Sequence, residues 1–492
     1  MGSSESPTHS STCPVTGAGL DPDFLADLTA YVAIPSVSRD AGPATMAAAA
    51  AFLADRLSWA GGRVETTAGH PVVRGDWLGA PGRPTVLVYG HYDVQPAGDP
   101  AGWSHPPFEL TPGVGPDGED VLRGRGVTDD KGPVLLVLDM ARTLLDRDGA
   151  LPLNVRFLVE GEEEIGSPHL AGYVRDHAAE LAADLVVSAD GAMWRPGTPS
   201  IAIGSRGLLA LDVEVTGPAR DLHSGRYGGV SANPAHVLVA ALASLHHDDG
   251  SITVPGFTDG VTPLGDDRRA EIAVVEFDAE SFLAAAGVGA PFGEPGHTTL
   301  ERLWERPTLE VNGIRAGSSA TIIPAVASAH VTCRLVPGQD PQQVLNAIAD
   351  HLRALSTTPG TVLTVRAEAG AVPAYRIDPG HPAVRAGVAA LAAVTPGTPV
   401  LLDVVGGTLP ATTVFERELG VKTLFFSFST SDENLHGPDE FFRVARFAEG
   451  ARAWEHLWRL LADTLPPVGH DRPEIARSGH TGGSGPVVTG AP

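Results

Sequence analysis

The chain contains little cysteine and little lysine. Its only cysteines are Cys13 and Cys333, which excludes metal sites built on cysteine thiolates. A disulfide between the two is possible, but such sparing use of cysteine is typical of a reducing compartment, and we expect a cytoplasmic protein. Lysine occurs only at positions 131 and 422, so arginine supplies nearly all of the positive charge.

Long apolar runs are also missing. No segment approaches the roughly 20 apolar residues that cross a bilayer, so we expect no membrane partner. The N-terminal stretch MGSSESPTHSSTCPVTGAG has neither the basic region nor the apolar region of a secretory signal. Basic residues are outnumbered, with 34 lysines and arginines against 59 acidic residues and a formal net charge of −25. Because phosphate binding needs a basic surface, this charge argues against a nucleic-acid partner.

The apolar residues, 43% of the chain, fall into segments that predict an α/β protein with an insertion. Helix-like and strand-like segments alternate over 21–206 and again over 373–465, which predicts a catalytic domain with a doubly wound, mostly parallel sheet. Between them, 207–372 contains strands with a two-residue period, typical of a separate α+β lid or dimerisation domain. The polar, Gly- and Pro-rich ends, 1–20 and 466–492, are predicted to be disordered tails.

Acidic residues and histidines follow four of the predicted strands, at the points where the strands end. The run VLVYG leads into His91 and Asp93, and ADLVVSA ends at Asp190. NVRFLVE precedes the three glutamates 162–164, and KTLFFSFST leads through a polar loop to His436. Sites in open α/β sheets form outside the carboxyl ends of the strands, so we expect these side chains to converge.

Asp129, in GRGVTDDKG directly before an apolar helix, completes the set. Two imidazoles and several carboxylates, without a thiolate, suit Zn²⁺, Mn²⁺ or Co²⁺. Crowded carboxylates repel each other unless cations neutralise them. Two metal ions roughly 3.5–4 Å apart, bridged by one carboxylate, would neutralise such a group. Water activated by such a pair needs a general base, and the neighbours Glu163 and Glu164 could supply one base and one ligand.

Each of these residues also has an ordinary structural explanation. Asp129 could cap the helix that follows it, and the run of glutamates could be a solvated turn. Asp190 precedes a glycine, as turn aspartates often do, and a single histidine such as His436 is more often a surface residue than a ligand. The occurrence of all of them together favours a metal site.

These segments resemble a known family. GHYDVQP, GRGVTDDKGP, EGEEEIGS, SAD and LHGPDE occur in the order and approximate spacing found in the co-catalytic di-zinc exopeptidases. That family includes cytosolic non-specific dipeptidases, carnosinases, aminoacylases, glutamate carboxypeptidases and succinyl-diaminopimelate desuccinylase. The resemblance covers about residues 22–462, and the long DDKGP and EGEEEIGS forms are most similar to the dipeptidase and carnosinase branch.

The resemblance implies two divalent metal ions, zinc or else manganese or cobalt. One ion would be held by His91, Asp129 and Asp190. The other would be held by Asp129, Glu164 and His436, so that Asp129 is shared between the two.

Further roles follow from the same resemblance. Glu163 corresponds to the general base, and Asp93 to the carboxylate that orients the first histidine. Glu162 fills a variable position and is expected to take no part in catalysis. The family has a cis peptide after the shared aspartate, here between Asp129 and Asp130.

The inserted segment carries matching motifs. DLHSGRYGGVSANP resembles the family's HSG, GG and NP signature, which implies a homodimer formed through the inserted domain. His223 of the partner subunit would then stabilise the oxyanion formed during hydrolysis. The residues that the resemblance assigns to substrate binding are Asn312, Thr321, Arg334, Gly407 and Thr408.

Two departures from the family pattern concern the substrate. Val404 and Val405 precede the GG pair where dipeptidases usually carry an Arg-Glu type sequence, and Ala320 stands where a lysine is usual. Both leave the predicted metal ligands intact. They bear on which substrate is cleaved.

The expected activity is hydrolysis of the amide bond of a small dipeptide by a metal-activated water, with Glu163 as the base. An N-acyl amino acid deacylase or a carboxypeptidase could use the same metal site. A catalytically silent binding protein is the alternative of another class, but such relatives typically lose a ligand or the base. A purely structural zinc centre would be a closed site, usually rich in cysteine.

Overall fold

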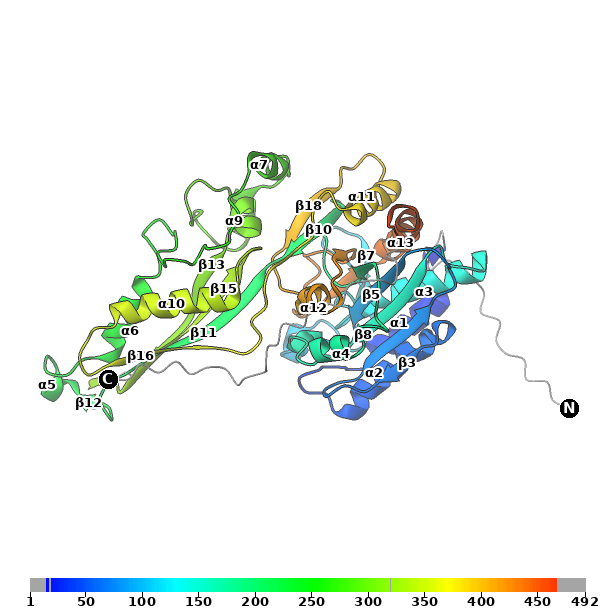
Figure 1. Cartoon of the computed structure of the whole chain (residues 1–492). Coiled ribbons are helices and arrows are strands. Elements are labelled where there is room, and N and C mark those ends of the chain that lie inside the picture. Colours follow the sequence, from blue (N-terminus) through cyan, green and yellow to red (C-terminus); the bar gives the residue numbers. More distant parts are fainter. Residues whose placement is uncertain (1–14, 17–18, 319, 467–492) are drawn as a thin grey trace. The chain divides into compact units, whose positions relative to one another are not determined.

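The computed structural model describes residues 15–16, 19–318 and 320–466, which divide into two compact units. The first unit contains the described residues up to Ile203, Ile377–Val405, and those from Leu409 onward. The second contains Gly204–Arg376, apart from residue 319, and Gly406–Thr408. Figure 1 colours both along the chain, and the second unit is mainly green and yellow. The segment 207–372, predicted as an insertion, lies within the second unit.

The first unit is built on a mostly parallel six-stranded sheet, which confirms the predicted α/β class. Its strand order is β19–β9–β5–β8–β4–β3, in which the first four strands run parallel to one another, β4 is antiparallel to β8, and β3 is antiparallel to β4. In β5 (Thr85–His91) every residue from Val86 onward is buried, as expected for a strand covered on both faces. The other strands are β3 (Arg63–Glu65), β4 (Val72–Trp77), β8 (Asn154–Glu160), β9 (Leu185–Ser188) and β19 (Thr423–Phe425).

The helices of this unit have clear local starts and stops. In α1 (Pro22–Val32), Asp21 accepts hydrogen bonds from the first backbone N–H groups, and proline occupies the first helical position. α3 (Lys131–Asp148) stops at Gly149, whose φ of 74° favours glycine. The others are α2 (Pro43–Arg56), α4 (Leu170–Asp176), α11 (Pro382–Val394), α12 (Pro410–Leu419) and α13 (Val444–Thr464), with the 3₁₀ turns η1 (Ser58–Ala60), η2 (Pro100–Gly102) and η3 (Glu163–Ile165). Within the described part of the chain, no helix has the length and apolar character needed to cross a membrane.

Short strands complete the first unit. A three-stranded sheet has the order β20–β7–β6, from β6 (Thr111–Val114), β7 (Asp120–Arg123) and β20 (Phe441–Arg443). β10 (Ser200–Ser205) runs on into the second unit, and β18 (Leu401–Val405) also belongs here. β1 (Val15–Thr16) pairs with β2 (Gly19–Leu20) within the segment 1–20, for which the sequence predicts a disordered tail. The rest of that tail, and residues 467–492, lie outside the described residues.

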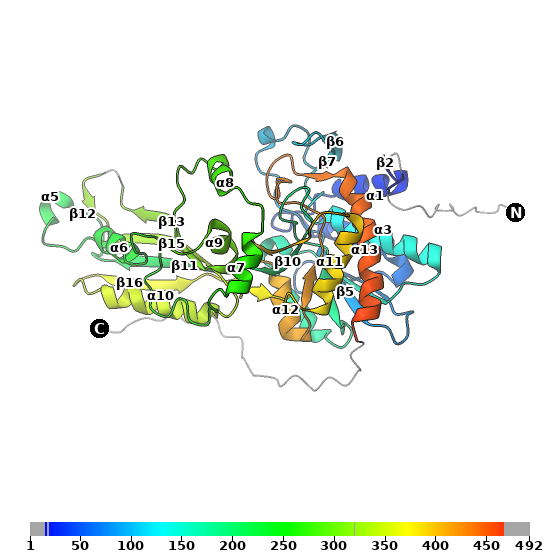
Figure 2. The same cartoon turned by 90° about the horizontal axis from the view of Figure 1, so that it is seen from above.

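The second unit is a four-stranded antiparallel sheet with two long helices on one face. The order is β13–β15–β11–β16, where β11 (Gly207–Thr216) and β15 (Val326–Leu335) alternate between buried and more exposed residues. α6 (Pro234–Ala243) and α10 (Pro341–Leu355) pack their apolar sides on the buried set, which includes the free thiol of Cys333. Figure 2 shows these helices beside the sheet. The remaining elements are β12 (Leu222–His223), α5 (Ser224–Tyr227), α7 (Asp266–Ala273), α8 (Ala279–Ala285), α9 (Thr299–Glu305), β13 (Thr308–Ala316), β14 (Ile322–Ile323), β16 (Val362–Ala367) and β17 (Tyr375–Arg376).

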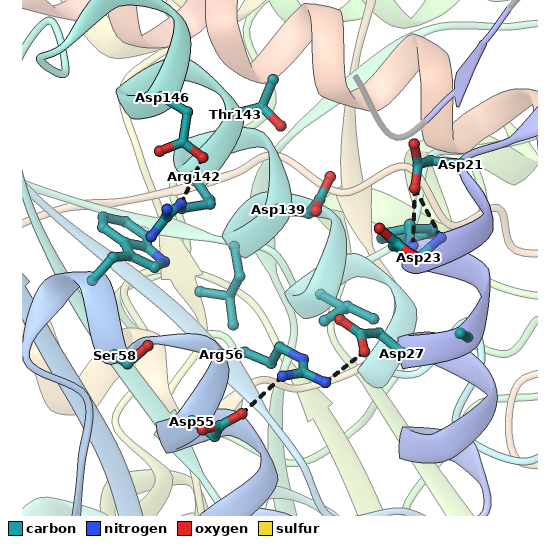
Figure 3. Close-up of a pocket in the computed structure, with 15 residues that line it drawn as sticks. Asp21, Asp23, Asp27, Asp55, Arg56, Ser58, Asp139, Arg142, Thr143 and Asp146 are labelled. Carbon is teal, nitrogen blue, oxygen red and sulfur yellow. Dashed lines mark hydrogen bonds and ion pairs between the residues drawn. The ribbon is translucent and has the colours of Figure 1, made fainter. Parts of the chain in front are cut away.

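A pocket of about 290 Å³ is lined by residues of α1, of the end of α2 and of α3 (Figure 3). Its arginines form ion pairs within the lining, Arg56 with Asp27 and Asp55, and Arg142 with Asp146. Asp139 of α3 differs, because its Oδ2 atom is buried and has no hydrogen-bond partner among the described residues. Burial raises the pKa of Asp139 to about 7, and three nearby aspartates of the N-terminal segment add to this effect.

We expect the substitution Asp139→Asn to stabilise the protein, and more so at high pH. The folded protein holds the Asp139 proton more tightly than the unfolded chain does. The protein therefore loses stability as the pH rises from the ordinary pKa of an aspartate to the raised pKa of about 7. Asparagine removes the penalty, worth about 1–4 kcal/mol above neutrality. In thermal unfolding scans, the gain in Tm should be a few degrees at pH 8 and clearly smaller at pH 5. An equal gain at both pH values would contradict the argument.

Candidate metal centre

Side chains of the kinds that bind metal ions lie together where β5, β8 and β9 end. His91 is the last residue of β5, Glu163 and Glu164 begin the turn η3 after β8, and Asp190 follows β9 by two residues. Because the three strands are neighbours and parallel, their carboxyl ends lie at one edge of the sheet.

Asp129 stands in the turn before α3, and the peptide bond to Asp130 is cis, as the resemblance implies. Asp129 is not the cap of this helix: the N-cap position is Asp130, and it makes no side-chain capping bond. The turn is held from a distant part of the chain by the buried carboxylate of Glu440. That carboxylate accepts hydrogen bonds from the backbone N–H groups of Gly126, Thr128 and Asp129, at 2.9, 3.0 and 3.2 Å.

His436 lies in the loop between β19 and β20, and this loop has a strained backbone. Asn434, His436 and Asp439 have φ values of 55°, 62° and 53°, in the left-handed region that non-glycine residues rarely adopt. Each such residue costs on the order of 1 kcal/mol or more, so surrounding contacts must hold it in place. One of these contacts is the backbone N–H of Ser104, which donates to Asp439 at 2.8 Å.

These residues form two groups of three that share Asp129. His91 Nε2 lies 3.0 Å from Asp129 Oδ1 and 3.9 Å from Asp190 Oδ2. His436 Nε2 lies 3.0 Å from Asp129 Oδ2 and 3.4 Å from Glu164 Oε2. In each group the potential ligand atoms all lie within 4.8 Å of one another, so each could hold one metal ion.

The electrostatics of the cluster are those of a site built for cations. Burial raises the pKa of Glu164 to about 8 and that of Asp190 to about 6, and the charge of Asp129 adds to both effects. The pKa of Glu163 is raised well above its ordinary range by burial, with Asp190 and Glu164 contributing. Burial also opposes ionisation of Asp129, but hydrogen bonds from the two histidines lower its pKa overall. Two divalent ions would neutralise this concentration of carboxylates, so the donor set fits a dinuclear centre.

Two further side chains orient the cluster. Asp93 accepts hydrogen bonds from the backbone N–H groups of Glu163 and Glu164, at 3.2 and 3.0 Å. Its carboxylate lies 3.4 Å from His91 Nδ1, whereas its backbone oxygen is closer, at 2.9 Å. Gln95 donates to Glu164 Oε2 at 2.7 Å, which fixes the direction of that carboxylate.

Residues 87–460 match the sequence profile of peptidase family M20/M25/M40, and these residues contain the whole cluster. The chain belongs to this family. The resemblance predicted from the motifs is therefore confirmed.

Named relatives cover most of the chain. It is 29% identical to the Cys-Gly metallodipeptidase of Saccharomyces cerevisiae, over 88% of this chain and 94% of that protein. It is 31% identical to the Beta-Ala-His dipeptidase of Rattus norvegicus, over 71% of this chain and 75% of the relative. A solved M20 metallo-carboxypeptidase from Sulfolobus solfataricus matches with a TM-score of 0.79 and 28% identity, covering 90% of this chain and all of the other. Human carnosine dipeptidase 1 matches with a TM-score of 0.71 and 27% identity, covering 90% of this chain and 97% of the other.

The predicted substrate residues belong to the second unit, where they fall into separate groups. Arg334 donates to the hydroxyl of Thr408 at 3.1 Å, and Gly407 adjoins Thr408 in the chain. His223 and Thr321 lie together, because β12 pairs with β14 in the register His223 with Ile322.

Asn312 is held apart from both groups. It lies on β13, where it accepts a hydrogen bond from Thr332 at 2.8 Å. Two sets of predicted residues therefore lie together, Arg334 with Gly407 and Thr408, and His223 with Thr321. Among the described residues, Asn312 makes no direct hydrogen bond to either set.

Three supporting residues were missed from the sequence. Gln95 and Glu440 stand within the motifs GHYDVQP and LHGPDE, which was the available signal. Arg206 is buried in the second unit, where its guanidinium donates to the backbone oxygen of Arg306 at 2.5 Å and to that of Arg334 at 3.3 Å. Burial lowers the pKa of Arg206 to about 10, and the nearby Arg334 adds to this effect, so this region is rich in positive charge.

Proposed function

We propose that this M20 peptidase is a metal-dependent dipeptidase, with two divalent ions in the cluster around Asp129. The observation that carries the proposal is that the two carboxylate oxygens of Asp129 face different histidines, each at 3.0 Å. A carboxylate shared in this way suits a pair of ions. The substrate class is supported by relatives named for the hydrolysis of Cys-Gly and Beta-Ala-His. Zinc is the proposed metal, and manganese or cobalt would suit the same oxygen and nitrogen ligands.

When bound, the two ions would activate a water molecule and polarise the carbonyl of the scissile amide. Glu163 accepts a proton as the water attacks and returns it to the leaving amine. Burial raises the pKa of Glu163 above its ordinary value, which favours a carboxyl group that can hold the proton between the two steps. Asp93 positions this residue through its hydrogen bond to the Glu163 backbone.

In the second unit, Arg334, Gly407 and Thr408 bind the free carboxylate of the substrate. Arg334 donates to the Thr408 hydroxyl at 3.1 Å, and that hydroxyl donates to the backbone oxygen of Arg206 at 2.7 Å. The guanidinium is held in this way, and its other N–H groups can donate to the oxygens of a carboxylate. The residues proposed to act beside them are Asn312, Thr321 and, for the oxyanion, His223 of the partner subunit.

The proposed homodimer is supported by the edge strand β13. Residues 310–316 of this strand are all exposed, including Val311 and Ile314, and β13 has only β15 as a sheet neighbour among the described strands. An exposed edge strand of this length, with two large apolar side chains, is suited to pairing with a second copy. Light scattering of the purified chain should therefore give the mass of a dimer, and a monomer would contradict the proposal. A cytoplasmic location is supported by the free, buried Cys333.

The test of the proposed function is a substrate panel with the purified enzyme and added Zn²⁺ or Mn²⁺. We expect cleavage of dipeptides with free termini, and slower cleavage or none of N-acyl amino acids and longer peptides. Cleavage of acylated amino acids alone would overturn the dipeptidase assignment and leave the metal site standing. Release of C-terminal residues from long peptides would favour the carboxypeptidase alternative, for which the Sulfolobus solfataricus structure is a precedent. Inactivity on every substrate with metal bound would favour a silent binding protein.

A further inference from the structure

We infer that the second unit carries an additional divalent-metal site, formed by Asp212, His330 and Glu368. Asp212 and His330 belong to adjacent strands of the four-stranded sheet, Glu368 directly follows a third strand, and none of them belongs to the Asp129 cluster. Asp212 of β11 is the direct register partner of His330 of β15. Glu368 follows β16, and its backbone N–H donates to the oxygen of Ala210 in β11 at 2.9 Å.

Both carboxylates approach the same nitrogen atom. His330 Nδ1 lies 3.2 Å from Asp212 Oδ1 and 3.3 Å from Glu368 Oε1, and all three atoms lie within 4.8 Å of one another. A protonated Nδ1 carries a single hydrogen, which two acceptors could share only in a bifurcated hydrogen bond. Charge-assisted hydrogen bonds are also typically shorter, about 2.7–2.9 Å.

The spacing suits a tetrahedral ion instead. With metal–nitrogen and metal–oxygen distances of roughly 2.0–2.2 Å, two ligand atoms of a tetrahedral site lie about 3.3–3.5 Å apart. The two distances from His330 Nδ1, 3.2 Å to Asp212 and 3.3 Å to Glu368, agree with this value or fall just below it. A dication would also neutralise two carboxylates that otherwise stand together on the sheet.

The neighbouring side chains leave room for such an ion. Gly313 of β13 is the register partner of His330 on the other side, and a Cβ built there meets nothing within 4 Å. A water could therefore complete the coordination from this side. The nearby Arg366 is directed to Glu214, with a separation of 3.5 Å. One imidazole with two carboxylates suits a borderline ion such as Zn²⁺, Co²⁺ or Ni²⁺.

The predicted consequence is a third zinc equivalent per chain. The full-length protein, loaded with two equivalents of Zn²⁺, would be titrated calorimetrically with more Zn²⁺. We expect the unaltered protein to bind one further equivalent. In His330→Ala the affinity of this site for Zn²⁺ should fall by about 100-fold or more, because removing even a residue that only orients a metal ligand lowers metal affinity about 10–100-fold. The matched control is His297→Ala, in the same unit, where an exposed histidine contacts only the oxygen of Pro295 among the interactions described.

Two measurements keep the test decisive. In unfolding scans without metal, His330→Ala should have the same Tm as the unaltered protein. Added Zn²⁺ should raise the Tm of the unaltered protein more than it raises the Tm of His330→Ala. Asp129→Asn should lose the first equivalents and keep the third, which separates this inference from the proposed dipeptidase centre. Absence of a third equivalent, or its persistence in His330→Ala, would overturn the inference.

Discussion

Replacing Glu163 with glutamine should reduce kcat for dipeptide hydrolysis by about 10²–10⁴-fold and leave the metal content unchanged. The amide of glutamine is nearly the same size and shape as the carboxylate, but it cannot accept and return a proton. Glu163 is absent from both three-residue groups around Asp129, so its loss removes no potential ligand. The measurement is steady-state kinetics on a cleaved dipeptide, together with metal analysis of the same preparation.

The adjacent residue supplies the control. Glu162 is directed away from the cluster, because its carboxylate contacts His169 Nδ1 at 2.8 Å and accepts from the backbone N–H of His70 at 3.1 Å. Glu162→Gln should therefore keep most of the activity, although both substitutions remove one charge from the same turn. If Glu163→Gln retained more than about a tenth of kcat, or if the two variants lost activity equally, the assignment of the base would be wrong.

The sequence predicted the cluster because its residues follow recognisable strands. VLVYG and ADLVVSA are short apolar runs that end in a ligand-type residue, and parallel strands bring such ends to one edge. The N-cap alternative for Asp129 could not be excluded from the sequence, since an aspartate before a helix usually caps it. The structure decides the point: Asp130 is the N-cap residue, and both oxygens of Asp129 face histidines.

The supporting contacts could not be predicted in the same way. Glu440 holds three backbone N–H groups of the turn before α3, more than 300 residues earlier in the chain. Backbone N–H groups are the same for every residue type, so such a contact leaves no pattern in the sequence of the turn. Only the fold reveals it.

The second unit shows a similar division. The two-residue period of β11 and β15 was visible because one face of this sheet is buried. The stretch 251–300 contains many prolines and glycines, and α7, α8 and the start of α9 lie in it. α7 and α8 are short and mostly exposed, so they lack the long apolar stripe that identifies a buried helix.

Replacing Asp129 should reduce metal binding more than replacing any other single residue of the cluster. It belongs to both three-residue groups, whereas Asp190 belongs to one. We therefore expect Asp129→Asn to lose both tightly bound ions and Asp190→Asn to lose one. Because the ions supply several kcal/mol of transition-state stabilisation, Asp129→Asn should lower kcat/KM by about 10³-fold or more.

The measurement is metal analysis after gel filtration, combined with dipeptide hydrolysis at increasing metal concentration. Excess metal should partly restore Asp190→Asn, whose second group is intact, and it should restore Asp129→Asn much less. The graded result matters because a general loss of structure would remove metal from both variants alike. Equal metal content in Asp129→Asn and the unaltered protein would contradict the shared role of this carboxylate, since its two oxygens, each 3.0 Å from a histidine, are what joins the two groups into one centre.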